Sequence, residues 1–128
     1  MTAKTVVSTD AAPGPFQGAP YSQATVYGGL VFVAGQLGLK VGDQSIEGGV
    51  AEQTEQIFRN LSAILEAAGS GLERLVKTTV FLTSLGDFAA MNEVYAKHVG
   101  PEPPARSTVE ISALPSGALV EIEAIATA

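Results

Sequence analysis

Two charged residues near the carboxyl end of the chain, Arg106 and Glu121, are of types that can bind a small molecule and act on it. Arg106 comes shortly after Pro103 and Pro104. Proline restricts its own backbone and that of the residue before it, so the segment that leads to Arg106 is stiff. A guanidinium is a planar group that binds a carboxylate through two parallel hydrogen bonds. A glutamate nearby can transfer a proton. The pair therefore predicts a site for a small carboxylic acid, while an ordinary ion pair between adjacent strands remains the alternative.

Alternating apolar and strand-forming residues predict the elements that carry these two side chains. Arg106 begins a strand-like run that extends to residue 111, and Glu121 lies inside a second run over 120–125. Further strands are predicted over 5–8 and 72–84, and a hairpin is predicted from residues 20–27 and 30–34. Its turn is Gly28-Gly29, because glycine readily adopts the positive φ that tight hairpin turns need.

Helical spacing of apolar residues occurs over 50–68 and again from the cap at Ser84 to about Val99. The order of elements predicts an α+β fold in a single domain over residues 1–128, with two helices on one face of a mixed sheet. The opposite face is left without helices. Because 46% of residues are hydrophobic and only 16% are charged, we expect that face to be buried against further copies of the chain.

Composition excludes several kinds of site. The chain has no cysteine, and its single histidine, His98, has no partner at metal-ligand spacing, so we expect no metal. Neither a phosphate-binding glycine motif nor a Gly-x-Ser-x-Gly nucleophile turn occurs. A net charge of −6 with scattered lysine and arginine argues against nucleic acid. No apolar run is long enough for a membrane, and the amino terminus lacks a signal-peptide pattern, so we expect a cytoplasmic protein.

A small set of other residues interrupts the apolar elements. Tyr21 follows Pro20 at a strand start, and Asn92 lies beside the apolar stripe of the second predicted helix. Gly35 ends the predicted hairpin strand. Two explanations for this glycine remain: a β-bulge, or the close approach of a ligand or another chain to the backbone.

Blocks of sequence along nearly the whole chain resemble the Rid (YjgF/YER057c/UK114) family, and its RidA-type members in particular. The blocks that carry the resemblance are 20–24, 34–36, 53–54, 76–81, 92–95, 104–107, 114–115 and 120–124. The resemblance implies a chorismate-mutase-like fold and a homotrimer with a central β-barrel, whose active sites lie in clefts between subunits. It also implies hydrolysis of enamines and imines such as 2-aminoacrylate to 2-keto acids and ammonia, without a cofactor.

The same resemblance implies a role for each candidate residue. Arg106 would bind the substrate carboxylate, and Glu121 would position or deprotonate the attacking water or protonate the leaving amine. The backbone of Gly35 would pass close to the ligand. Tyr21 and Asn92 would line the pocket, Tyr21 from a neighbouring region of the trimer.

Two departures from the family pattern leave the substrate range open. Ala34 stands where many relatives have serine, and Thr108, a predicted substrate-binding residue, occupies a position often held by cysteine. A trimer of the same fold that binds small 2-keto acids without turnover is the alternative function. Ribonuclease activity or translation inhibition, an older description of some family members, fits an acidic chain poorly.

Overall fold

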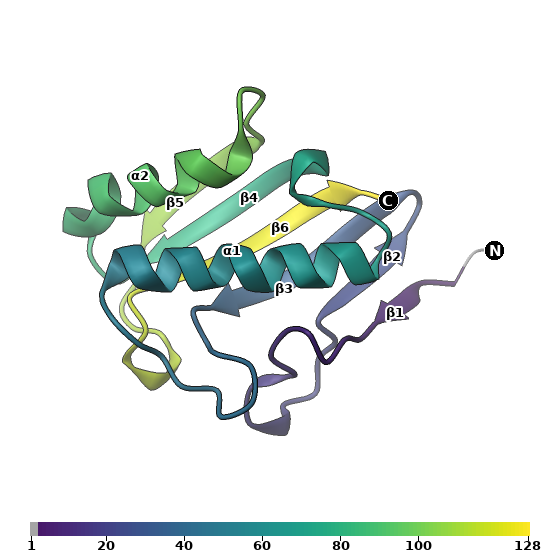
Figure 1. The fold of residues 1–128 in the computed structure, drawn as a ribbon, viewed down its shortest axis with the longest axis horizontal. Coiled ribbons are helices and arrows are strands. Elements are labelled where there is room, and N and C mark those ends of the chain that lie inside the picture. Colours follow the sequence, from purple (N-terminus) through teal and green to yellow (C-terminus); the bar gives the residue numbers. More distant parts are fainter. Residues whose placement is uncertain (1–2) are drawn as a thin grey trace.

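Six strands form one mixed sheet, and two helices lie together on one of its faces (Figure 1). In the computed structural model, which describes residues 3–128, the helices are α1 (Val50–Ala67) and α2 (Phe88–Val99). The strands are β1 (Thr5–Val7), β2 (Ala24–Tyr27), β3 (Leu30–Leu37), β4 (Leu75–Leu82), β5 (Ala105–Glu110) and β6 (Val120–Thr127). The predicted α+β architecture, with two helices on one face of a mixed sheet, is confirmed.

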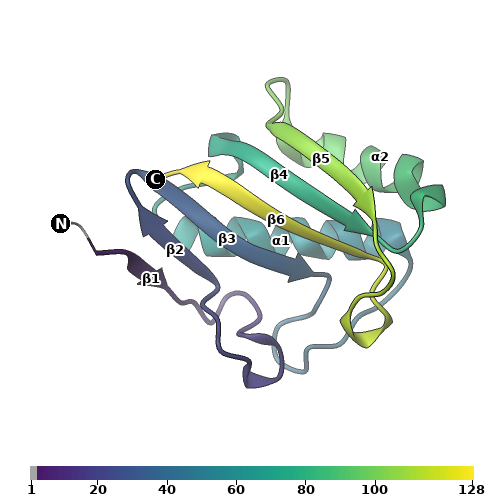
Figure 2. The same ribbon diagram turned by 180° about the vertical axis from the view of Figure 1, so that it is seen from behind.

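The order of the strands in the sheet is β1-β2-β3-β6-β4-β5. The last strand of the chain, β6, lies in the middle and pairs antiparallel with β3 and β4. β5 pairs only with β4, in parallel, and forms one edge of the sheet beside α2 (Figures 1 and 2). Because β4 separates β5 from β6, Arg106 and Glu121 are not on adjacent strands. The alternative prediction, an ion pair between these two residues, is therefore wrong.

The β2–β3 hairpin turns at Gly28 and Gly29, both with positive φ, as predicted. Strand β3 continues beyond Ala34, however, and ends at Leu37. Its pairing with β6 shifts register between Val33 and Gln36, which is the signature of a bulge. The bulge explanation for Gly35 is therefore confirmed, while the predicted end of the strand at residue 34 is wrong.

The hydrophobic core lies between α1, α2 and the covered face of the sheet. One stripe of α1 is fully buried there and consists of Ile57, Phe58, Leu61, Ile64 and Leu65. Two buried amides of the same helix hold loops against it. Gln53 Oε1 accepts a hydrogen bond from the backbone N–H of Leu119 (2.9 Å), and Asn60 Nδ2 donates to the carbonyl oxygens of Leu37 (3.2 Å) and Leu39 (3.0 Å).

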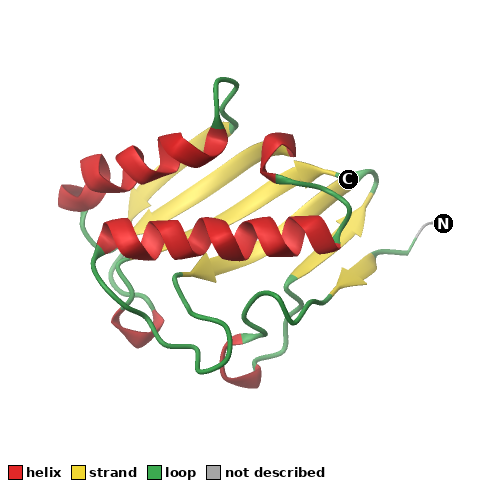
Figure 3. Cartoon of the chain, in the orientation of Figure 1, coloured by secondary structure: helices red, strands yellow, loops and turns green. Residues whose placement is uncertain are grey.

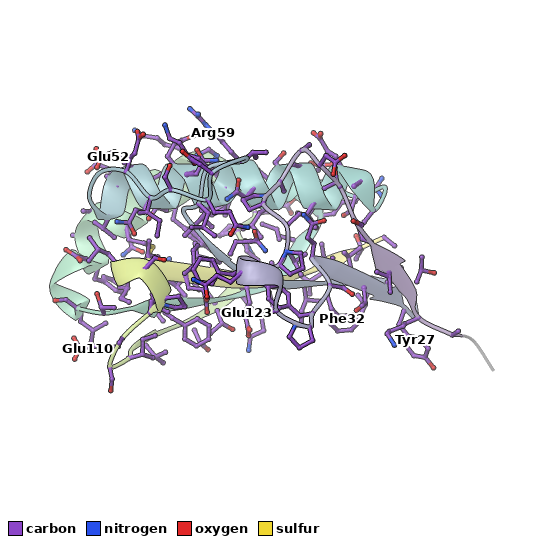
Figure 4. The ribbon with its side chains drawn as sticks, turned by 90° about the horizontal axis from the view of Figure 1, so that it is seen from below. Tyr27, Phe32, Glu52, Arg59, Glu110 and Glu123 are labelled. Atoms are coloured by element: carbon purple, nitrogen blue, oxygen red, sulfur yellow. The ribbon has the colours of Figure 1, made fainter. Side chains whose placement is uncertain are left out.

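The opposite face of the sheet carries no helix (Figure 2). Glu121, Glu123 and Ile125 of β6 point to this open face, because the residues between them are buried on the helix side. Phe32 of β3 and Val109 of β5 are exposed, and Figure 4 shows Phe32 and Glu123 on the side of the sheet away from α1. The uncovered, partly apolar face is as predicted, while the homotrimer that would bury it stays a prediction.

Three longer connections, residues 8–23, 38–49 and 111–119, lie along the same side of the molecule (Figure 3). Residues from all three line one cavity, which reaches the open face of the sheet. No helix among residues 3–128 combines the length and the hydrophobicity that crossing a membrane requires.

Candidate active site

The predicted site residues fall into two groups that lie on opposite faces of the sheet. Tyr21, Gly35 and Glu121 line the cavity at the open face, and we name them the open-face cluster. Asn92, Arg106 and Thr108 lie on the other side, and we name them the helix-face cluster. Arg106 and Thr108 pair in register with Thr78 and Val80 of β4, which are both buried on the helix side. No single chain can therefore bring all six residues together.

The open-face cavity has a volume of about 380 Å³. Its walls are largely apolar and include Phe16, Leu37, Leu39 and Phe81. Two carboxylates, Glu121 and Glu123, enter this apolar setting from alternate positions of β6. The cavity has the character of a small-ligand site, which is mostly apolar with a few polar groups.

Glu121 lies directly over the β3 bulge. A Cβ atom at position 35 would stand 2.8 Å from Glu121 Cδ and 2.9 Å from its Oε1, so only glycine leaves room for the carboxyl group. Burial raises the pKa of Glu121 above its ordinary value, and the negative charge of Glu123 raises that pKa further. A half-buried carboxyl group with a raised pKa is suited to exchange a proton with a ligand.

Replacing Gly35 with alanine is expected to displace the Glu121 carboxyl group and to lower turnover by about tenfold or more, because small misplacements of reacting groups are costly. Steady-state kinetics of the reaction proposed below measures the effect. Gly49→Ala is the matched control, since the nearest atom to its added Cβ is 3.6 Å away. Full activity in Gly35→Ala would show that the position of Glu121 over the bulge does not matter.

Tyr21 and Gln23 organise the loop that forms another wall of the cavity. The Tyr21 hydroxyl oxygen accepts a hydrogen bond from the backbone N–H of Phe16 (2.6 Å). Gln23 is buried, and its amide binds the backbone of Thr9 (Oε1 to N, 2.7 Å) and of Pro13 (Nε2 to O, 2.9 Å). Gln23 and Glu123 were not predicted as site residues, although both lie inside sequence blocks that carry the family resemblance.

In the helix-face cluster, Arg106 is flanked by aromatic rings rather than by an acid. Its guanidinium carbon lies 4.7 Å from the ring centroid of Tyr95 and 5.5 Å from that of Phe88. Within residues 3–128 it forms no ion pair, since the salt bridges found there involve Lys40, Arg59 and His98. A positive charge without an anionic partner is a natural receptor for a ligand carboxylate.

Two polar atoms beside this arginine are buried without a hydrogen-bond partner among the described residues. They are Oδ1 of Asn92 and Oγ1 of Thr108. Unpaired buried polar atoms are costly, so they commonly mark a place where a ligand, a water molecule or another chain completes the structure. Asn92 and Arg106 also line a crevice of about 400 Å³ between α2 and β5.

The single histidine has a structural position away from both clusters. His98 Nε2 lies 2.9 Å from Glu55 Oε1, and its ring stacks on Phe58 with centroids 4.7 Å apart. The hydrogen bond with His98 lowers the pKa of Glu55. His98 thus joins α2 to α1, and no group of three histidine, aspartate or glutamate side chains placed to hold a metal occurs within residues 3–128.

Comparisons with known proteins agree with the fold and with the family resemblance. Residues 10–128 match the family model described as Endoribonuclease L-PSP. The chain is 48% identical to a RutC family protein of Pyrococcus horikoshii, over 96% of this chain and 97% of that protein. It is 41% identical to the Homo sapiens protein named 2-iminobutanoate/2-iminopropanoate deaminase, over 94% of this chain and 88% of that protein.

Solved structures extend the likeness to the whole fold. RidA from the Antarctic bacterium Psychrobacter sp. superposes with a TM-score of 0.92 at 42% identity, covering 97% of this chain and 99% of that one. Escherichia coli TdcF with bound serine superposes with a TM-score of 0.88 at 37% identity, covering 97% and 98%. The architecture and the two polar clusters thus define a small α+β protein of the chorismate-mutase-like type. The chain belongs to the Rid family.

Proposed function

We propose that the protein hydrolyses small enamines and imines that carry a carboxylate, such as 2-aminoacrylate, to 2-keto acids and ammonia. The observation that carries the proposal is Arg106, a guanidinium held against aromatic rings with no acidic partner in the described chain. The raised pKa of Glu121 adds a group for proton transfer in the other cluster. Likeness to the human deaminase supports the same reaction class.

In this proposal, Arg106 binds the substrate carboxylate and so fixes the neighbouring imine carbon. An enamine first tautomerises to the imine, which reacts in its nitrogen-protonated form. Glu121 accepts a proton from a water molecule as the water oxygen bonds to the imine carbon and the π electrons of the carbon–nitrogen bond move to the nitrogen, giving a neutral carbinolamine. Glu121 then gives the proton to the carbinolamine nitrogen, and the carbon–nitrogen bond breaks with its electron pair leaving on ammonia. The hydroxyl group passes its proton to the departing ammonia, which leaves as ammonium while the carbonyl of the 2-keto acid forms. Positioning suffices for a large part of the acceleration because the substrate is itself reactive, and water is the only co-reactant.

Asn92 and Thr108 would complete the recognition of the substrate. Asn92 Oδ1, buried without a partner in the described chain, suits a hydrogen bond from a substrate N–H. Thr108 Oγ1 can donate to the bound carboxylate or to a water molecule. Tyr21 and Gly35 would contribute the wall of the cavity beside Glu121.

We further propose that each active site forms between two copies of the chain in a homotrimer. Arg106 and Glu121 lie on opposite faces of one sheet, so they can act together only if the open-face cluster of one chain meets the helix-face cluster of another. The partly apolar open face and the edge strand β5 offer surfaces for such contacts.

Mixing two inactive variants tests the shared site. Arg106→Ala and Glu121→Gln chains, exchanged after mild denaturation and refolding at equal amounts, are expected to regain activity in about a quarter of the sites, because each site draws one residue from each of two chains. Each variant refolded alone is the control. A mixture as inactive as the separate variants would place both residues in the same chain's site. Light scattering that gives the mass of a monomer would also contradict the trimer.

A second candidate is a trimer that binds small amino or keto acids without turnover. The likeness to TdcF with bound serine favours it, because that protein holds a small carboxylic acid. Calorimetric titration with 2-oxobutanoate together with an imine hydrolysis assay separates the two functions. Binding of the keto acid without acceleration of hydrolysis over buffer would favour this second candidate.

A further inference from the structure

Two aromatic side chains of α2 lie against the Arg106 guanidinium. Neither is among the residues to which the family resemblance gives a role in the reaction. Phe88 and Tyr95 lie two helical turns apart, so they share the helix face that packs on β5. The guanidinium carbon of Arg106 stands 4.7 Å from the ring centroid of Tyr95 and 5.5 Å from that of Phe88. Both separations are within the range of a cation–π contact.

Tyr95 is itself fixed from two sides. It is only 5% exposed, and its hydroxyl oxygen lies 2.6 Å from Thr78 Oγ1 in a buried hydrogen bond. Its ring also meets Phe58 of α1 edge to face, with centroids 5.3 Å apart. Thr78 is the residue of β4 that pairs with Arg106, so the strand beside the arginine also anchors the ring that supports it.

The geometry of this support leaves the arginine able to bind a ligand. A cation–π contact is an attraction between the positive charge and the ring, and it does not require the N–H donors to bind an acid. A carboxylate partner within the chain would have occupied those donors, and no such partner exists among residues 3–128. A guanidinium already held in place loses less conformational freedom when a ligand binds than a free side chain does.

We propose that Tyr95 is a positioning residue, whose ring, anchored by Thr78, holds the Arg106 guanidinium ready for the substrate carboxylate. The ring of Phe88, 5.5 Å from the guanidinium carbon, assists it. The proposal rests on the proposed function, in which Arg106 binds a carboxylate. In this role Tyr95 acts through Arg106.

Side-chain order tests the positioning without any ligand. Nitrogen-15 relaxation at Arg106 Nε is expected to show a restricted side chain in the wild-type protein and a mobile one in Tyr95→Leu. Tyr95→Phe, which keeps the ring and loses the bond to Thr78, is expected to lie between them. An Arg106 side chain that is equally mobile in all three proteins would overturn the proposal, whatever the protein is found to catalyse.

Ligand affinity gives a second readout. Tyr95→Leu is expected to raise KM for an imine substrate, and Kd for 2-oxobutanoate, by about fivefold to tenfold with little change in kcat. In an Arg106→Ala background the same change is expected to have no further effect on affinity. A residue with a purely structural role would weaken binding equally in both backgrounds, and that result would refute the positioning role.

A substitution at the more exposed of the two aromatic residues tests the proposal without the risk of misfolding. Phe88 is 41% exposed, so Phe88→Leu preserves the core and is expected to raise KM about twofold to threefold. Leu85→Ala, at a neighbouring residue that is 49% exposed, is the control with unchanged KM. Normal KM and normal Arg106 order in Phe88→Leu and Tyr95→Phe together would overturn the proposal. Normal order and keto-acid binding without imine hydrolysis would instead overturn only the proposed reaction.

Discussion

Replacing Arg106 with alanine is expected to lower kcat/KM for 2-aminoacrylate hydrolysis by about two orders of magnitude. A hydrogen bond to a charged group contributes about 1.5–3 kcal/mol, and here the carboxylate would lose two such bonds to the same guanidinium. Arg106→Lys keeps the charge and loses the planar pair of donors, so it is expected to retain intermediate activity. The order wild type, lysine, alanine is the signature of bidentate carboxylate binding.

The measurement couples a dehydratase that generates 2-aminoacrylate to the release of its 2-keto acid. Arg59→Ala is the matched control, because Arg59 is an exposed arginine of α1 whose nearest acid is Glu55 of the same helix at 3.6 Å. Equal rates in wild type and Arg106→Ala would remove Arg106 from the mechanism. A wild-type rate no faster than buffer would show that the deaminase proposal is wrong.

Replacing Glu121 with glutamine is expected to reduce turnover by about 10²- to 10⁴-fold, the range typical for loss of a general acid or base. Glutamine keeps the size of the side chain and one acceptor oxygen, but it replaces the other oxygen with an NH2 donor and cannot carry the proton. Glu66→Gln, on the exposed surface of α1, is the control with unchanged rate. Near wild-type turnover in Glu121→Gln would mean that water attacks without help from this carboxyl group.

The same variant is expected to gain stability at neutral and alkaline pH. Burial raises the pKa of Glu121 in the folded protein above its value in the unfolded chain. Stability from this group is therefore fully present below the unfolded pKa and is lost as pH rises through the folded pKa. Glutamine avoids that loss, and the gain is modest because the carboxyl group is half exposed and screened by solvent.

Urea denaturation at about pH 4 and about pH 8 measures this effect, since the two values bracket the titration of a carboxyl group with a raised pKa. Glu121→Gln is expected to unfold at a higher urea concentration than the wild type at the higher pH, with a smaller difference at the lower pH. A wild-type protein that is the more stable of the two at the higher pH would contradict the raised pKa. If Glu121→Gln is less active but more stable than the wild type, Glu121 serves function at a cost to the stability of the fold.

Local patterns were sufficient to predict the elements but not their order in the sheet. The alternation in β4 and the helical spacing from Val50 correspond to a strand and a helix, because each pattern reflects one buried face. Nothing local in 120–125 indicates that β6 lies between β3 and β4, since strand pairing over long sequence distances depends on the whole core. For the same reason the alternative of an ion pair between adjacent strands stayed open from the sequence, and only the structure shows that β4 separates Arg106 from Glu121.

The residue types of the candidate site could be predicted, while their arrangement could not. Period-two alternation places Glu121 and Glu123 on one face of β6, but it does not say how that face relates to the face of β5 that bears Arg106. Tyr95 looked like one more apolar residue of the second helix, because its contact with the arginine exists only after α2 packs on β5. Gln23 looked like a hairpin residue, since its partners lie 10 to 14 positions away along an irregular loop.

The separation of the two clusters by the thickness of one sheet has a kinetic consequence. An isolated chain presents Arg106 on one side of the sheet and Glu121 on the other. Under the proposed arrangement, specific activity is not constant on dilution but declines once the subunits come apart, and it recovers when they are concentrated again. Activity would then require assembly of the subunits, and the concentration of the protein would determine the fraction of it that is active.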